Sequence, residues 1–124
     1  MSQDIVADAL NKILNAKKAN KKSVIIKMHS KLLISILAIA KLKGYIKNYK
    51  IEKPNLIVEL GDIHQCKAIK PRFVVETGKI ETYIKRYLPT RNIGIIIIST
   101  SQGLMTHQTA IEKNLGGSLI AYLY

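Results

Sequence analysis

The sequence has few of the residues that mark secreted or membrane-spanning proteins. It holds no tryptophan and a single cysteine, Cys66. One cysteine cannot form an internal disulfide, so a disulfide scaffold is excluded and a reducing compartment is indicated. The longest apolar run, residues 32–40, includes a serine and has about half the ~18 residues that a membrane-spanning helix needs. The acidic start lacks the basic and apolar regions of a secretory signal, so we expect a cytoplasmic protein.

Acidic residues are also scarce. Eight Asp and Glu stand against 20 Lys and Arg, which gives a net charge of +12 and a pI near 9.9. Residues 1–53 hold 12 of the cations and three of the acids, and 17 of the 20 cations are lysines. Such a charge indicates a polyanionic partner: nucleic acid, an anionic membrane surface or an acidic protein. Lysine suits the neutralisation of phosphates better than the bidentate reading of bases, for which arginine is preferred.

The first half predicts a small α/β layer. Apolar spacing predicts a helix over residues 5–16 and a second helix that Ser30 caps and Gly44 ends. A strand at 24–26 lies between the helices, and alternation over 45–60 predicts a hairpin that turns at 53–55. We therefore expect an N-terminal domain over residues 1–62 with the element order α-β-α-β-β.

The second half predicts mostly antiparallel strands with short helices. The predicted strands lie around 66–69, at 73–75, at 95–98 and after 117, and in the last of them Leu119, Ala121 and Leu123 share one face. A helix is expected over 80–87, a loop over 99–103, and a further helix from a Thr106 cap to about residue 114. The fold class is α+β with two small domains, the second spanning residues 63–124.

Residues that could carry catalysis are isolated. His29, His64 and His107 have no second ligand at metal-binding spacing, and each is expected at a surface or an interface. Cys66 reads better as a small buried side chain than as a reactive thiol, and Asp4 and Asp8 better as helix-capping acids than as a metal pair. We expect no enzyme, no metal, no cofactor and no small-molecule substrate.

Two segments indicate nucleic-acid binding instead. Six lysines gather within fifteen residues, which favours contact with a phosphate backbone over a merely solvated face. They are Lys17, Lys18, Lys21, Lys22, Lys27 and Lys31. The other segment follows the isoleucine run: Ser99, Thr100 and Ser101 precede Gly103, and small hydroxyls at a rigid strand end can enter a shallow RNA minor groove. A helix-capping turn remains the alternative for this segment.

The run Gly-Ile-Ile-Ile-Ile-Ser-Thr-Ser-Gln-Gly-Leu-Met-Thr-His over 94–107, followed by Gly116-Gly117, resembles the signature of the small-subunit ribosomal protein eight family. The opening helix and the segments Ser30-Lys31-Leu32 and Lys43-Gly44-Tyr45-Ile46 are similar to that family as well. Pro71-Arg72-Phe73, Leu88-Pro89-Thr90-Arg91 and His107 resemble its archaeal and eukaryotic branch. The resemblance covers essentially the whole chain.

The resemblance implies a structural ribosomal protein that binds a central-domain helix of small-subunit rRNA and supports assembly of the platform. Its partners would be that rRNA and neighbouring ribosomal proteins, in the cytosolic ribosome. Ser99, Thr100, Ser101 and Gly103 would form the RNA-reading loop, with Gly116 and Gly117 beside it. Asn15, Ser30 and Lys31 would make separate rRNA contacts.

The sequence departs from the family pattern near the loop. Gln102 and Ile111 replace residues that are often cationic, and Ser118 replaces a bacterial glutamate. These departures weaken the expectation of phosphate contacts there but not that of hydroxyl contacts. Two other functions stay open at this point: a free regulatory module that binds a similar mRNA hairpin, and a basic protein–protein adaptor.

Overall fold

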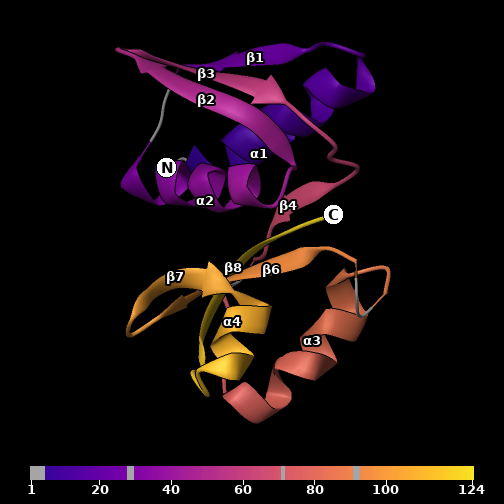
Figure 1. Ribbon diagram of the computed structural model, residues 1–124, viewed down its shortest axis with the longest axis vertical. Helices are drawn as coiled ribbons and strands as arrows, with labels where there is room; N and C mark the ends of the chain where they lie inside the picture. Colours follow the sequence, from indigo (N-terminus) through magenta and orange to yellow (C-terminus); the bar gives the residue numbers. More distant parts are fainter. Residues whose placement is uncertain (1–4, 28–29, 71, 91–92) are drawn as a thin grey trace. The chain divides into compact units, whose positions relative to one another are not determined.

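A computed structural model describes residues 5–27, 30–70, 72–90 and 93–124. The chain divides into two compact units, which we call the N-terminal unit (Met1–Lys67) and the C-terminal unit (Ala68–Tyr124). Figure 1 shows the helices and strands of each unit, and we describe the units one at a time.

The N-terminal unit is a three-stranded antiparallel sheet with two helices. Its elements are α1 (Ile5–Lys18), β1 (Ser23–Ile26), α2 (Lys31–Leu42), β2 (Ile46–Glu52) and β3 (Asn55–Leu60). The strand order is β1-β3-β2, and both helices lie on the same side of the sheet (Figure 1). The predicted α-β-α-β-β order is confirmed, and so is the hairpin, in which Glu52 pairs with Asn55.

Local capping explains where α2 begins and ends. The Ser30 side chain accepts a hydrogen bond from the Leu33 amide and so satisfies one of the unpaired N–H groups of the first turn. After the helix, Gly44 takes φ +83°, a left-handed conformation that glycine adopts without a steric penalty. The predicted cap of α1, Asp4, lies outside the described residues.

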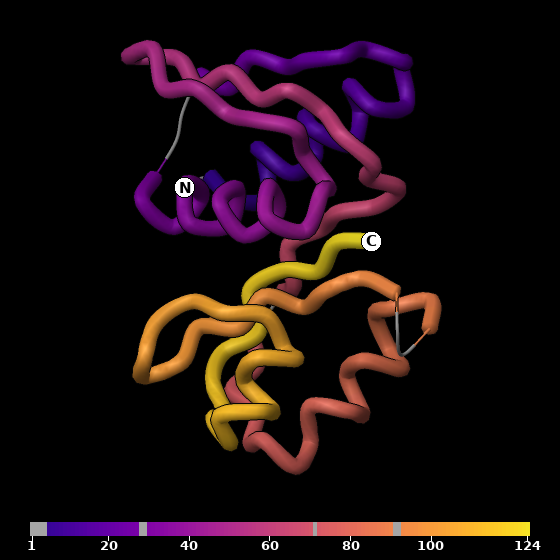
Figure 2. Tube along the Cα trace, in the orientation of Figure 1, coloured from indigo at the N-terminus to yellow at the C-terminus, as the bar shows by residue number. Residues whose placement is uncertain are grey.

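The C-terminal unit is built on a second antiparallel sheet. Its elements are β4 (Cys66–Ala68), in which the boundary between the units falls, β5 (Val74–Val75), the 3₁₀ helix η1 (Thr77–Lys79), α3 (Ile80–Tyr87), β6 (Ile95–Thr100), β7 (Gly103–Thr106), α4 (His107–Glu112) and β8 (Gly117–Leu123). The strand order is β4-β8-β6-β7, and β5 pairs with β8. Figure 2 traces β7, α4 and β8 as the orange-to-yellow end of the chain.

The isoleucine run forms the centre of this sheet. Ile95, Ile96, Ile97 and Ile98 are all buried, as predicted. Their strand, β6, is an inner strand with β8 on one side and β7 on the other. Ten buried residues pack into one core, and they come from both helices and four strands as well as from connecting segments. The core consists of Ile69, Val75, Ile80, Ile84, Leu88, Ile96, Ile98, Met105, Ala110 and Leu119.

The prediction of a loop over residues 99–103 is wrong, because most of these residues belong to strands. The strand β6 continues to Thr100, β7 begins at Gly103, and only Ser101 and Gln102 connect them. Ser99 pairs with Leu104 and Thr100 with Gly103, so the segment is a tight hairpin with strand register on both sides. The polar residues of this segment are typical of a loop. Its partner strand, β7, has only four residues, which is too short for its alternation to indicate a strand.

The predicted faces of the last strand are also wrong. Ile98 pairs with Leu119 but Ile97 pairs with Ala121, so Ile120 is an extra residue in β8. A bulge of this kind reverses the alternation beyond it. As a result Leu119 lies in the same core cluster as the partly buried Tyr122, instead of on the opposite face.

Candidate nucleic-acid interface

The hairpin between β6 and β7 presents small side chains at its tip. Ser99, Ser101, Gln102 and Gly103 are exposed, while Ile95–Ile98 immediately before them are buried. The tip therefore extends directly from a strand that the core holds in place. A hydroxyl on such a support loses little freedom on binding, because its backbone is already ordered.

Thr100 has a different role within the same tip. Its Oγ1 donates to the Gly103 carbonyl at 2.9 Å and accepts from the Gln102 amide at 3.1 Å. The single hydroxyl proton is therefore used inside the turn. This arrangement fixes the shape of the tip, while Ser99 and Ser101 keep exposed side chains.

Three glycines lie in the hairpin or next to it. A Cβ on Gly117 would collide with the Ser99 carbonyl, and one on Gly116 would collide with the Val75 carbonyl, so β8 passes closely between β5 and β6. Gly103 takes φ +110°, which disfavours any other residue, yet a Cβ there would meet no protein atom within 4 Å. Gly103 thus leaves open space where a ligand can approach the backbone.

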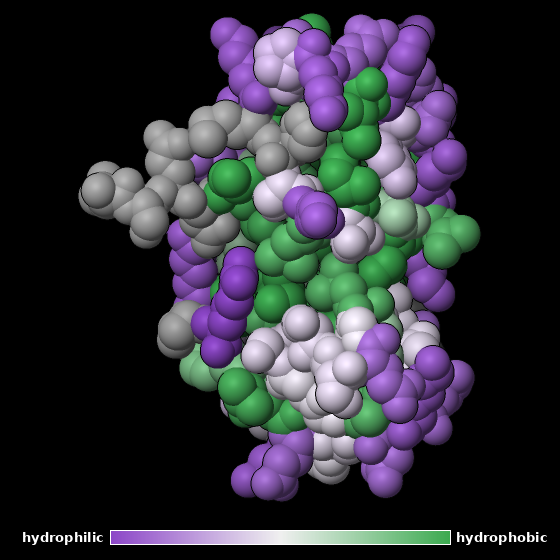
Figure 3. Space-filling view, turned by 90° about the vertical axis from the view of Figure 1, so that its left-hand side faces the viewer, coloured by the Kyte–Doolittle hydropathy of each residue, from purple (hydrophilic) through white to green (hydrophobic). Residues whose placement is uncertain are grey.

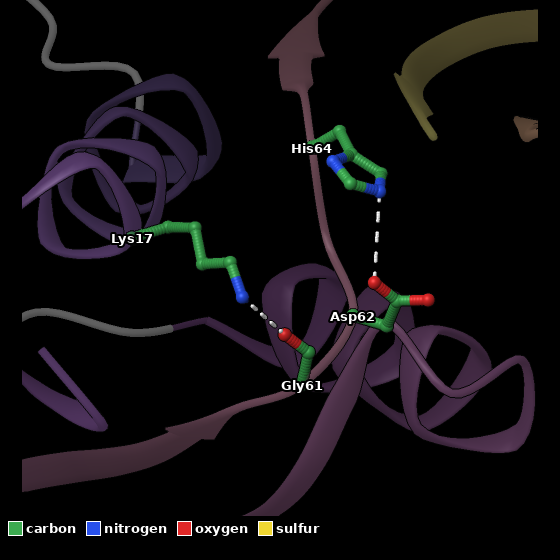
Figure 4. A network of polar contacts seen from close by, with 4 residues as sticks. All are labelled: Lys17, Gly61, Asp62 and His64. Atoms are coloured by element: carbon green, nitrogen blue, oxygen red, sulfur yellow. Dashed lines mark hydrogen bonds and ion pairs between the residues drawn. The ribbon is translucent and has the colours of Figure 1, made fainter. Parts of the chain in front are cut away.

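The predicted lysine cluster lies in the N-terminal unit, at the end of α1 and in the segment that leads through β1. Lys18, Lys21, Lys22, Lys27 and Lys31 are exposed. Lys17 is partly buried, and its ammonium donates to the Gly61 carbonyl at 2.9 Å (Figure 4). The six predicted cations are therefore not equivalent.

Several of these lysines line one surface depression of about 910 Å³. Its lining contains four lysines, two carboxylates and a few small or amide side chains. The residues are Lys17, Asn20, Lys21, Lys22, Ser23, Gly44, Lys47, Glu59, Leu60, Gly61 and Asp62. Lys47 of β2 was not predicted to belong to this group. It lies at a register shift, between Ile46, which pairs with Leu60, and Asn48, which pairs with Glu59, so alternation along the hairpin does not indicate its position.

The other predicted contacts of this unit lie apart from the depression. Asn15 is exposed on α1 and Lys31 is exposed in the first turn of α2. Ser30 is occupied as the cap of α2, where its side chain accepts from Leu33. No residue of this group lines the depression.

The isolated nucleophile and histidines offer no catalytic arrangement among the described residues. The predicted buried position of Cys66 is confirmed. Burial raises the pKa of this thiol to about 12, and the thiol donates to the Leu10 carbonyl. His64 is exposed 3.6 Å from Asp62, as a surface histidine should be. His29 lies outside the described residues.

The prediction that His107 lies at a surface or an interface is wrong. It is buried, and its Nδ1 accepts a hydrogen bond from the Ile96 amide at 3.0 Å. An accepting Nδ1 carries no proton, so the ring provides one additional hydrogen-bond acceptor for the backbone of β6. No local pattern indicates this contact, because it joins residues eleven positions apart.

A row of aromatic rings in the C-terminal unit was also missed. Phe73, Tyr83, Tyr87, Tyr122 and Tyr124 follow one another with ring centroids 5.2–6.4 Å apart. The Arg86 guanidinium lies over two of these rings, at 5.7 and 5.6 Å from their centroids. All five rings are partly buried against the core, so the row completes the packing between α3 and the sheet.

In Figure 3 hydrophilic side chains lie at the top of the view, over the sheet of the N-terminal unit, and also along the right side and the lower edge. Side chains of intermediate hydropathy lie lower in the view, on the side of the C-terminal unit where Figure 1 shows β7. Among the described residues, no cluster of acids, histidines and cysteines could hold a metal, and no helix is long and apolar enough to cross a membrane.

Comparison with known proteins matches the whole chain to one family. The family model described as "Ribosomal protein S8" matches residues 4–124. The small ribosomal subunit protein uS8 of Nanoarchaeum equitans and that of Archaeoglobus fulgidus are each 42% identical over 129 aligned residues, with full coverage of both chains. The protein named small ribosomal subunit protein uS8my of Arabidopsis thaliana is 40% identical over the same span.

Proposed function

The chain belongs to the ribosomal protein S8 family, and on that premise we propose that it is a structural constituent of the small ribosomal subunit that binds rRNA. The observation that carries this proposal is the full-length match, since it includes both the lysine-rich segment and the Ser-Thr-Ser hairpin. A full-length match to ribosomal proteins favours this function over a free regulatory module or a protein adaptor.

The hairpin is the proposed determinant of site choice. The hydroxyls of Ser99 and Ser101 would bond 2′-hydroxyls and base edges in an irregular minor groove, and Gly103 would let the backbone approach closely. Each such bond contributes about 0.5–1.5 kcal/mol net. Several of them from an ordered tip suffice to distinguish one RNA site from a generic duplex.

The glycines and Thr100 would act on RNA through the hairpin they shape. Gly116 and Gly117 allow β8 to lie against β5 and β6, and Thr100 closes the turn at the tip. Direct contact of Gly116, Gly117 and Thr100 with RNA stays a prediction. Their contacts within the protein support an indirect role, in which they shape the hairpin.

The lysines are the proposed source of general affinity. Lys18, Lys21, Lys22 and Lys31 are exposed on a unit that carries 13 lysines and five acids. Each phosphate that such a cation neutralises releases counterions, which makes binding depend on salt but not on sequence. Asn15 and Ser30 remain proposed contacts beside these lysines.

The finer assignments follow from the family. We propose a central-domain rRNA helix as the binding site, neighbouring ribosomal proteins as further partners, and the cytosolic ribosome as the location. We also propose that residues 1–62 and 63–124 act as separate domains and that the protein has no catalytic activity, as expected of a structural component.

Footprinting tests this proposal directly. The purified protein is bound to its own small-subunit rRNA and the backbone is probed with hydroxyl radicals. We expect protection concentrated in a central-domain helix, and loss of that protection when Ser101→Ala and Ser99→Ala are combined. Protection spread evenly over the rRNA, or none at all, would contradict the proposed function.

A further inference from the structure

The depression in the N-terminal unit contains two kinds of lysine. The ammonium groups of Lys21, Lys22 and Lys47 form no hydrogen bond or ion pair with another described residue, and all three side chains are exposed. Lys17 is different, because its ammonium is bonded to the Gly61 carbonyl and its side chain is partly buried. Three cations are therefore available to a ligand, and one is held by the protein.

The bond from Lys17 is made at a point where three segments converge. The amide of Gly61 donates to the Tyr45 carbonyl and that of Asp62 donates to the Gly44 carbonyl, each at 3.2 Å. A Cβ on Gly61 would lie 2.8 Å from the Gly44 carbonyl oxygen, so the end of β3 presses against the turn before β2. Lys17 ties the last turn of α1 to this crossing, as Figure 4 shows.

The charges of the depression select its occupant. Four lysines face two carboxylates, Glu59 and Asp62, and Asp62 also lies 3.6 Å from His64. The unit as a whole has 13 lysines against five acids. A volume of about 910 Å³ is large for a single ion and suits an extended polyanion lying along the lysine side. Lysine ammoniums are compact point charges that fit phosphates without demanding a fixed geometry.

We propose that this depression binds the phosphate backbone of one RNA strand through Lys21, Lys22 and Lys47, and that Lys17 is a positioning residue that fixes its shape through Gly61. The inference rests on the proposed rRNA-binding function and narrows it. On this proposal, affinity for RNA depends on one defined surface of the N-terminal unit and not on the total charge of the unit. This surface includes Lys47 of β2, which lies 25 positions beyond Lys22 in the sequence.

The first experiment compares two charge-matched triple variants of the full chain. Lys21→Gln, Lys22→Gln and Lys47→Gln remove the proposed contacts, whereas Lys12→Gln, Lys53→Gln and Lys67→Gln remove the same charge from exposed positions that do not line the depression. Binding to a single-stranded oligo-uridylate is measured over a range of salt concentrations. We expect the first triple to reduce the slope of log K against log salt by about 2 and the control triple to leave it nearly unchanged.

Three results would overturn the proposal. Equal reductions in both triples would mean that total charge alone matters. An unchanged slope in the first triple would remove the depression from the interface. Competition by poly-glutamate that the first triple abolishes, together with unaltered RNA binding, would assign the depression to an acidic protein. If the unmodified protein itself shows no salt-dependent RNA binding, the proposed rRNA-binding function is wrong too. The other three results leave that function standing and contradict only the role of the depression.

The second experiment tests the role of Lys17. Lys17→Met leaves the Gly61 carbonyl without its ammonium partner, so we expect a fall in Tm of a few degrees and weaker RNA binding at an unchanged salt slope. Lys17→Arg keeps a donor and should restore both Tm and affinity. A slope lowered by about one with an unchanged Tm would show that Lys17 binds phosphate itself and would overturn its positioning role.

Discussion

The two units present opposite kinds of surface. The N-terminal unit offers long, charged, exposed side chains around a depression, and Lys17 is the one lining lysine whose ammonium bonds to another described residue. The C-terminal unit offers short hydroxyls on a hairpin that extends from a fully buried strand. Long cations attract a polyanion from any direction, while an ordered tip can distinguish one groove shape from another. This difference underlies the proposal that affinity and site choice come from different parts of the chain.

The largest effect is expected from a substitution that disrupts the ordered C-terminal unit by separating β8 from β6. Gly117→Val places a branched side chain against the Ser99 carbonyl, and we expect it to destabilise the protein by about 3 kcal/mol, because backbone cannot yield as a flexible side chain can. Thermal unfolding measures the loss. Gly78→Ala is the matched control, because a Cβ there meets nothing within 4 Å and its φ is not positive, so we expect a change within about 0.5 kcal/mol.

The next largest effect is expected at the buried hydrogen bond between the Ile96 amide and His107. His107→Phe keeps a ring of similar size but leaves the Ile96 amide without its acceptor, which costs about 1–3 kcal/mol in the free energy of unfolding. Denaturant titration measures this cost. His64→Ala, at an exposed histidine, should change stability little. Equal effects of the two substitutions would show that the Ile96 contact does not stabilise the sheet.

The hydroxyls at the tip should affect recognition and not folding. Ser99→Ala and Ser101→Ala each remove an exposed hydroxyl, and we expect each to weaken binding to the cognate rRNA helix by about 0.5–1.5 kcal/mol. Binding to a generic duplex should stay the same. Gln108→Ala, exposed on α4 outside the hairpin, serves as the control. Equal losses on both RNAs would mean that the tip adds affinity without specificity.

The smallest effect at neutral pH concerns the buried thiol of the N-terminal unit, which influences stability only under alkaline conditions. Because burial raises the pKa of Cys66 from an ordinary value near 9 to about 12, the native thiol keeps its proton at a pH where the unfolded thiol has lost it. The unfolded state then binds fewer protons, so this group lowers stability as the pH rises from about 9 to 12 and has no effect below that window. Cys66→Ala should remove this part of the alkaline loss, which unfolding at several pH values measures. An identical alkaline loss in the variant would contradict the assignment.

Much of the fold could be predicted from the sequence because its signals are local. The apolar stripe of α2, its Ser30 cap and the left-handed Gly44 all lie within fifteen residues. In the hairpin of β2 and β3 the two strands meet at a short turn, and buried side chains alternate along β3. The buried isoleucine strand was predicted because four β-branched residues in a row suit only a covered strand.

The errors arose where structure depends on distant residues. The strand β7 is recognisable only through its pairing with β6, and the bulge at Ile120 only through register with Ile97 and Ile98. The same holds for the candidate site. The lysines near α1 were predicted as a cluster, but the addition of Lys47 and the bond from Lys17 to Gly61 result from the tertiary fold.

Salt titration on two RNAs tests the central claim most directly. The combined Ser99→Ala and Ser101→Ala variant and the Lys21→Gln, Lys22→Gln and Lys47→Gln variant are each bound to the cognate rRNA helix and to a generic duplex over a range of salt concentrations. We predict that the serine variant lowers the ratio of cognate to generic affinity at an unchanged salt slope, while the lysine variant lowers the slope at an unchanged ratio. If both variants change the ratio and the slope alike, affinity and site choice are not divided between the two units.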